Sequence, residues 1–130
     1  MVFGTFDVLH LGHIAFLKAA RKYSEKLVVV ISRDKSAERI KKTKLRFKEG
    51  ERAAMVRELR LVDEVVSGKN ADFRKAVAVY KPAIIALGYD QEAYVDKLRR
   101  FLTEKGLNTK VVRLKAFKAR RYKTSLFINR

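Results

Sequence analysis

The sequence contains no cysteine, which excludes disulfide bridges and thiolate metal sites. No run of apolar residues approaches the ~20 positions that a membrane-spanning helix requires. The only proline, Pro82, directly precedes an apolar run, and the first residues lack the pattern of a secretory signal peptide. We therefore expect a cytoplasmic protein with no membrane partner.

Acidic residues are scarce, because 14 Asp and Glu stand against 31 Lys and Arg, giving a formal net charge of +17. Such an excess attracts polyanions such as RNA, or it accompanies a small anionic substrate while most of the charges are solvated. The basic residues are spread along the chain, and they are densest at residues 39–48 and 113–123. This spread favours a small anionic substrate over nucleic acid.

Apolar runs alternate with amphipathic stretches, and hydrophobic residues make up 48% of the sequence. Short, uninterrupted, β-branched runs are typical of parallel strands buried on both faces; they lie at residues 2–5, 27–31, 64–66, 83–87 and 111–114. Helical patterns occupy residues 11–23, 49–59, 71–80 and 93–105. With no linker or repeat, this pattern predicts one domain, residues 1–130: an α/β three-layer sandwich with right-handed crossovers and a five-stranded parallel sheet.

The first of these strands is short for its place in such a sheet. Residues 2–5 offer it three or four positions, whereas a central strand usually has about five. We expect either an unusually short first strand or a sequence from which a few initial residues are missing.

The clearest functional signal is the segment GTFDVLHLGH at residues 4–13, where a strand ends, a turn follows and a helix begins near Leu11. The only two histidines, His10 and His13, lie three residues apart and share one face of the first helical turn. Gly12 leaves room for a phosphate to approach the backbone, and the helix N-terminus presents N–H groups and a positive dipole end. Two imidazoles beside such amides can stabilise charge that develops on a phosphoryl oxygen.

Other interpretations of this turn stay open. The two histidine rings could merely cap or pack the helix start, or they could bind a metal, although no third ligand lies nearby in the sequence. Asp7 could hold a divalent metal weakly, or its carboxylate could cap the turn. Asp34 could contact a nucleotide or cap the helix that follows it.

The segment GTFDVLHLGH resembles the HxGH signature of the cytidylyltransferase-like nucleotidyltransferases, whose Rossmann-like fold is shared with class I aminoacyl-tRNA synthetases. The resemblance covers nearly the whole chain, including SRD at 32–34, VDEV at 62–65 and YKTS at 122–125. ALGYDQ at 86–91 is similar to the form of this segment in archaeal FAD synthases. The glycerol-3-phosphate cytidylyltransferases tend to carry GDDW at that position.

The resemblance implies roles for individual residues. His10 and His13 would bind the triphosphate and stabilise the transition state, and Lys44 would act with them from a loop of phosphate-binding lysines that also holds Lys41 and Lys42. We expect this loop to order only around a nucleotide. The backbone of Thr5 and Phe6 would lie along the α-phosphate. The full set of nucleotide-binding residues implied is Gly4, Thr5, Phe6, Gly12, Gly88, Asp90, Arg121, Thr124 and Ser125.

Several of these positions have ordinary structural interpretations. The lysine loop could be a solvated run of charge, and Gly88 could be a glycine that simply ends a strand. Thr124 and Ser125 are good helix N-caps, which are also places where a phosphate can dock. The arginine expected to hold the triphosphate is Arg121, with Arg113 and Arg120 as alternatives.

The reaction that the resemblance implies is transfer of AMP from ATP to FMN, with release of pyrophosphate. The chain has no cysteine nucleophile and no glycine–serine elbow, so we expect direct in-line attack without a covalent intermediate. Mg²⁺ is expected to neutralise the triphosphate. The alternatives are CTP-dependent transfer to glycerol 3-phosphate, and a basic RNA-binding module without activity. Members of the family are commonly dimers, which makes a homodimer a candidate assembly.

Overall fold

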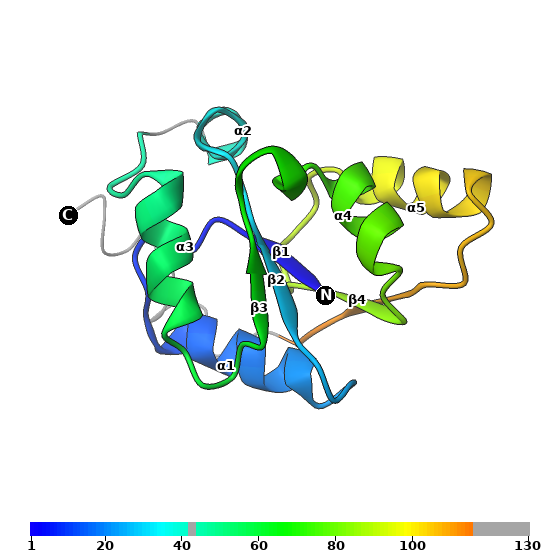
Figure 1. The fold of residues 1–130 in the computed structure, drawn as a ribbon, viewed down its shortest axis with the longest axis horizontal. Helices are drawn as coiled ribbons and strands as arrows, with labels where there is room; N and C mark the ends of the chain where they lie inside the picture. Colours follow the sequence, from blue (N-terminus) through cyan, green and yellow to red (C-terminus); the bar gives the residue numbers. More distant parts are fainter. Residues whose placement is uncertain (42–43, 116–130) are drawn as a thin grey trace.

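The computed structural model describes residues 1–41 and 44–115, and Figure 1 shows how their helices surround the strands. Strands and helices alternate, as the sequence pattern predicts. In chain order the elements are β1 (Val2–Gly4), α1 (Leu11–Arg21), β2 (Val28–Ile31), α2 (Asp34–Lys41), α3 (Glu49–Arg57), β3 (Glu64–Val66), the 3₁₀ helix η1 (Gly68–Ala71), α4 (Phe73–Tyr80), β4 (Ile84–Leu87), α5 (Val95–Glu104) and β5 (Lys110–Arg113).

The strands pair in parallel, in two sheets rather than one. The first sheet has the order β1-β2-β3, and the second consists of β4 and β5. The predicted α/β Rossmann-like class is confirmed, and the predicted single five-stranded sheet is wrong for the residues that the structure describes.

The physical reason for the split lies where β1 begins. The Met1 nitrogen donates to the Ile84 carbonyl at 2.9 Å, and the Met1 carbonyl accepts from Ala86 N at 3.0 Å. These two bonds hold β4 alongside the start of β1. Two residues further on, the Phe3 carbonyl accepts instead from the side-chain amide of Gln91, at 3.2 Å. The ladder between β1 and β4 therefore stops after one residue.

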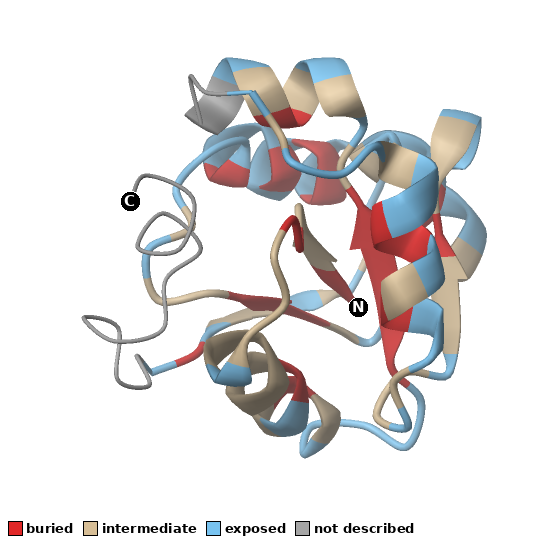
Figure 2. Cartoon of the chain, turned by 90° about the vertical axis from the view of Figure 1, so that its left-hand side faces the viewer, coloured by how far each residue is buried: buried red, intermediate tan, exposed pale blue. Residues whose placement is uncertain are grey.

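Helices cover both faces of the sheets. Val28 and Val30 of β2 belong to a core with α4 and α5, whereas Val29 and Ile31 belong to a core with α1 and α3. All four residues of β2 are buried. Figure 2 shows the same pattern, with buried residues along the strands and on the inner sides of the helices. The alternation of β2 side chains thus produces three layers.

The helices match the sequence pattern closely, with one exception. The four predicted helices are present within two residues of their predicted ends, and Asp72 caps α4 by accepting from Arg74 N at 2.8 Å. Helix α2 was not assigned, because its sequence DKSAERIK carries few apolar residues to mark a buried face. Within residues 1–41 and 44–115, each helix is too short or too polar to cross a bilayer.

Candidate active site

The turn between β1 and α1 adopts a backbone shape that only a few residue types accept. Phe6 has a φ of 52°, in the left-handed region that is disfavoured for a side chain of this size. Its ring folds back over Gly4, where an added Cβ would lie 2.5 Å from the Phe6 Cε2 atom. The ring is 4% exposed, and its centroid is 5.2 Å from that of His13. Gly4 and Phe6 therefore place the turn directly against the first turn of α1.

The two histidines are held by the backbone of that helix start. His10 is the N-cap, and its Nδ1 accepts from Gly12 N at 3.1 Å, while the Nδ1 of His13 accepts from His10 N at 3.2 Å. The rings stack with centroids 3.9 Å apart. Because Nδ1 accepts an N–H in each ring, we assign the hydrogen of each neutral imidazole to Nε2. In each ring, Nδ1 therefore accepts a backbone N–H at the helix start, and Nε2 carries the N–H donor.

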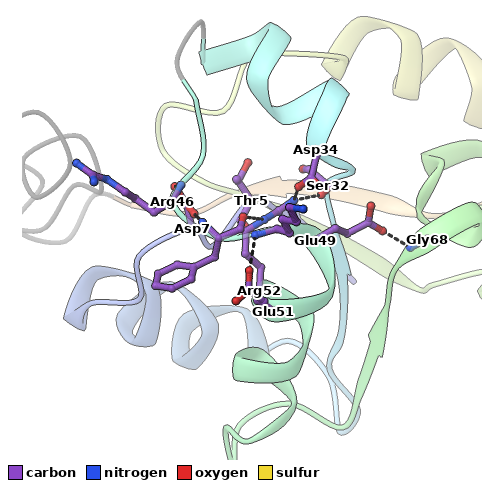
Figure 3. Close-up of polar contacts among 11 residues, drawn as sticks. Thr5, Asp7, Ser32, Asp34, Arg46, Glu49, Glu51, Arg52 and Gly68 are labelled. Carbon is purple, nitrogen blue, oxygen red and sulfur yellow. Dashed lines mark hydrogen bonds and ion pairs between the residues drawn. The ribbon is translucent and has the colours of Figure 1, made fainter.

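Asp7 lies in the same turn but on its buried side. Asp7 is 1% exposed, and its two carboxylate oxygens accept from Arg46 N and Phe47 N, both at 2.8 Å. Figure 3 shows this contact between the turn and the segment before α3. Both oxygens thus receive backbone amides, which favours the capping interpretation of Asp7 over a metal ligand.

Arg52 of α3 lies beneath the turn with no exposed surface. Its guanidinium donates to three backbone carbonyls and one carboxylate, which come from three different segments. The acceptors are the Phe47 carbonyl at 3.0 Å, the Thr5 and Ser32 carbonyls at 2.8 Å, and Asp34 Oδ1 at 2.7 Å. Asp34, whose role the sequence left open, is therefore an ion-pair partner of this arginine (Figure 3).

The loop after β4 is also fixed by hydrogen bonds. Gly88 N donates to the side-chain oxygen of Gln91 at 3.2 Å, and the amide of the same side chain reaches the Phe3 carbonyl. Arg113 of β5 donates to the Gly88 and Gln91 carbonyls, both at 2.9 Å. One glutamine and one arginine thus set the position of this loop beside the end of β1.

A cleft of about 870 Å³ opens between these segments. It lies at the carboxyl ends of β1, β2 and β4, where open α/β sheets bind ligands, and its size suits a nucleotide with an acceptor. One side is formed by the β1–α1 turn with His10 and His13, and the other by the starts of α4 and α5. The charged residues among its described lining are Arg33, Arg74, Lys115, Asp72, Asp90 and Glu92.

Most of the residues predicted from the sequence meet in this cleft. Those that line it are Gly4, Thr5, Phe6, His10, Gly12, His13, Gly88 and Asp90. Lys44 is exposed and lies outside the lining, and so does the buried Asp7. Lys42, Arg120, Arg121, Thr124 and Ser125 fall outside the described residues.

Sequence reasoning missed three residues of the site. Arg52 was given no role from the sequence, although it lies four residues before the buried Val56 and so shares the inner face of α3. Phe73 and Tyr94 line the cleft where α4 and α5 begin. The only feature of the sequence that could have identified these two residues is their position soon after the ends of β3 and β4.

Comparisons with known proteins agree with this geometry. The family model described as cytidylyltransferase-like matches residues 1–130. The FAD synthase of Thermoplasma volcanium is 40% identical over 117 residues, which are 90% of this chain and 82% of that protein. The FAD synthase of Archaeoglobus profundus is 43% identical over 113 residues, covering 87% of this chain and 72% of that protein.

A solved structure supports the same conclusion about the fold. The crystal structure of the lipopolysaccharide core biosynthesis protein from Thermoplasma volcanium has a TM-score of 0.81 and 40% sequence identity to this chain. The match covers 91% of this chain and 96% of that protein. The resemblance inferred from the HxGH and ALGYDQ segments is thereby confirmed.

Proposed function

Because this chain belongs to the cytidylyltransferase-like family, we propose that it is an FAD synthase, which transfers AMP from ATP to FMN and releases pyrophosphate. The single observation that carries the reaction class is the pair of backbone-held histidines at one end of a cleft large enough for both substrates. The choice of substrates follows the names of the archaeal relatives.

The proposed chemistry is a direct transfer between two phosphates. A phosphate oxygen of FMN forms a bond to the α-phosphorus of ATP, and the bond from that phosphorus to the bridging oxygen of pyrophosphate breaks. The attacking oxygen is already anionic near neutral pH, so no strong general base is required. Catalysis then depends on positioning the two phosphates and on stabilising charge in the transition state.

The histidines would supply most of that stabilisation. With Nδ1 of each ring accepting a backbone N–H, the Nε2–H groups of His10 and His13 are the donors for phosphate oxygens. The N-terminus of α1 adds the positive end of its dipole beside them. Both rings are fixed before the nucleotide binds, so little reorganisation is needed during the reaction.

Mg²⁺ would enter this site with the nucleotide. Within the described residues, no three potential ligands form a group that could hold a metal ion, and the Asp7 oxygens accept backbone amides. Protein-bound Mg²⁺ commonly takes many of its ligands from substrate phosphates and water. We therefore propose that the nucleotide substrate is the magnesium complex of ATP.

Further parts of the proposal rest on the sequence. Lys44, exposed and outside the cleft lining, would have to approach the phosphates when the nucleotide binds. The triphosphate contacts of Arg121, Thr124 and Ser125 lie outside the described residues. A cytoplasmic location and a homodimer also stay predictions.

The substrate assay tests the reaction. Purified protein is mixed with Mg²⁺ and either ATP or CTP, together with either FMN or glycerol 3-phosphate, and pyrophosphate is measured. We expect pyrophosphate with ATP and FMN, together with falling flavin fluorescence as the adenine of FAD stacks on the flavin ring. Pyrophosphate only with CTP and glycerol 3-phosphate would overturn the choice of acceptor. No reaction, together with steeply salt-dependent RNA binding, would overturn the enzyme itself.

A further inference from the structure

Two aromatic rings line the cleft where α4 and α5 begin. Phe73 opens α4 and Tyr94 is the N-cap residue of α5, and both line the cleft. Their ring centroids are 6.2 Å apart, with 31° between the planes. Phe73 also packs edge-on against the buried Phe101, at 6.1 Å, which fixes it to the core. We call Phe73 and Tyr94 the aromatic wall.

Tyr94 adopts an unfavourable backbone conformation although the residue is not buried. Its φ of 65° and ψ of 2° lie in the left-handed region, which costs free energy for any residue except glycine. The residue is 38% exposed, so core burial does not account for the strain. Strained residues of this kind concentrate at ligand sites, where the strain holds a side chain in its binding position.

We propose that the isoalloxazine ring of FMN stacks on the aromatic wall, an inference that rests on the proposed function. Ala93, Val95 and Leu98 also line the cleft and carry no side-chain hydrogen-bonding groups. The dimethylbenzene end of a flavin likewise has none, whereas every edge of adenine offers donors or acceptors. Two aromatic rings beside apolar side chains therefore suit the flavin better than the nucleotide base. The Arg74 guanidinium also lies over the Phe73 ring, with its central carbon 4.7 Å from the ring centroid.

The spacing of the wall also determines how the ring lies. A planar ring inserted between two others needs centroids about 7 Å apart, or two carbon contact distances. The 6.2 Å between Phe73 and Tyr94 is too short for a ring to enter between them. The flavin therefore lies with one face against both rings, and its phosphate chain extends across the cleft toward the histidines.

The test separates binding of FMN from binding of ATP. In the Tyr94→Gly variant the ring is lost while glycine accepts the positive φ, so the fold is kept. KM is measured for each substrate in this variant, in Phe73→Leu and in the control Tyr23→Ala, whose exposed tyrosine lies outside the cleft lining. Loss of a stacking partner commonly weakens binding by about fivefold or more. We expect KM for FMN to rise by at least that factor in the first two variants, with KM for ATP unchanged.

Other results would overturn either the stacking of FMN on the aromatic wall or the proposed reaction. If KM for ATP rises and KM for FMN does not, the wall holds adenine and the inference is overturned; it also fails if neither KM changes. If the folded wild type makes no FAD, the proposed function fails, and FMN binding is then measured directly by flavin fluorescence. Binding that weakens in Tyr94→Gly would preserve the aromatic wall, and equal binding or no binding would overturn it.

Discussion

On the buried side of the β1–α1 turn, Asp7 and Arg52 are 1% and 0% exposed, and both bind backbone groups of neighbouring segments. On the open side, His10 and His13 line the cleft, and the Nδ1 atom of each ring holds the helix start. The two sides share one short segment but differ in what their polar groups contact. From this difference we infer that the buried pair maintains the shape of the turn and the histidines perform its chemistry.

The largest expected effect is on the buried side. Arg52→Met removes the donor of four hydrogen bonds and leaves three carbonyls and the Asp34 carboxylate without it. An acceptor that loses its donor away from water costs about 1–3 kcal/mol, and three carbonyls are affected here, so we expect the free energy of unfolding to fall by about 3 kcal/mol or more. Urea unfolding measures the loss.

A matched arginine on the same helix provides the control. Arg57 is exposed in the last turn of α3, so Arg57→Met should change the free energy of unfolding by no more than about 0.5 kcal/mol. Equal losses in the two variants would show that burial of Arg52 has no special consequence.

The next effect concerns the open side and falls on turnover. We expect His10→Ala or His13→Ala to lower kcat by about 10²–10³-fold, as removal of one donor to a developing oxyanion does. His10→Asn sharpens this test, because asparagine is a good N-cap that can replace Nδ1 but not the Nε2 donor. Its Tm should stay near that of the wild type, while its kcat remains low. Recovery of turnover in His10→Asn would reduce the role of His10 to capping.

A smaller loss of stability is expected from Asp7→Asn. The amide can replace only one of the two carboxylate acceptors, so one of Arg46 N and Phe47 N loses its bond. An unsatisfied buried donor costs about 1–3 kcal/mol. Thermal unfolding measures this loss, and Asp96→Asn, at an exposed aspartate of α5, is the control. A fully stable Asp7→Asn protein would argue against a role of Asp7 in maintaining the shape of the turn.

The smallest effect lies far from the turn, at an exposed carboxylate. Hydrogen bonds from Leu27 N and then from Arg21 lower the pKa of Asp63 below its ordinary value. A lowered folded-state pKa stabilises the protein above the unfolded pKa, and this contribution disappears as the pH falls below about 4. The Tm advantage of wild type over Asp63→Asn should therefore shrink between pH 5 and pH 3. A constant difference would contradict the pKa shift.

The two sides of the turn were not equally predictable from the sequence. The histidines stand out because they are the only two in the chain and lie three residues apart at a strand-to-helix transition. The role of Arg52 depends on the carbonyls of Thr5, Ser32 and Phe47, which belong to three segments separated in sequence. Such a role becomes visible only after folding has brought those segments together.

The sheets show the same limit. Continuous β-branched runs such as residues 27–31 identify the strands, because burial on both faces excludes polar residues. Whether β4 pairs along β1 depends on a few individual bonds. The side chain of Gln91, which occupies the Phe3 carbonyl, decides it here. The hydrophobic pattern of a sequence does not indicate when a side chain takes a carbonyl that a neighbouring strand would otherwise bind.

The different roles of the buried and open sides of the β1–α1 turn are tested most directly by measuring kcat for His10→Asn and Asp7→Asn. The measurement is made at a temperature where both variants are folded, with saturating ATP, FMN and Mg²⁺. We expect turnover to fall by about 100-fold or more in His10→Asn at nearly wild-type stability. In Asp7→Asn we expect reduced stability with turnover close to that of the wild type. Loss of turnover in folded Asp7→Asn that additional Mg²⁺ restores, or near-normal turnover in His10→Asn, would contradict the separate roles of the two residues.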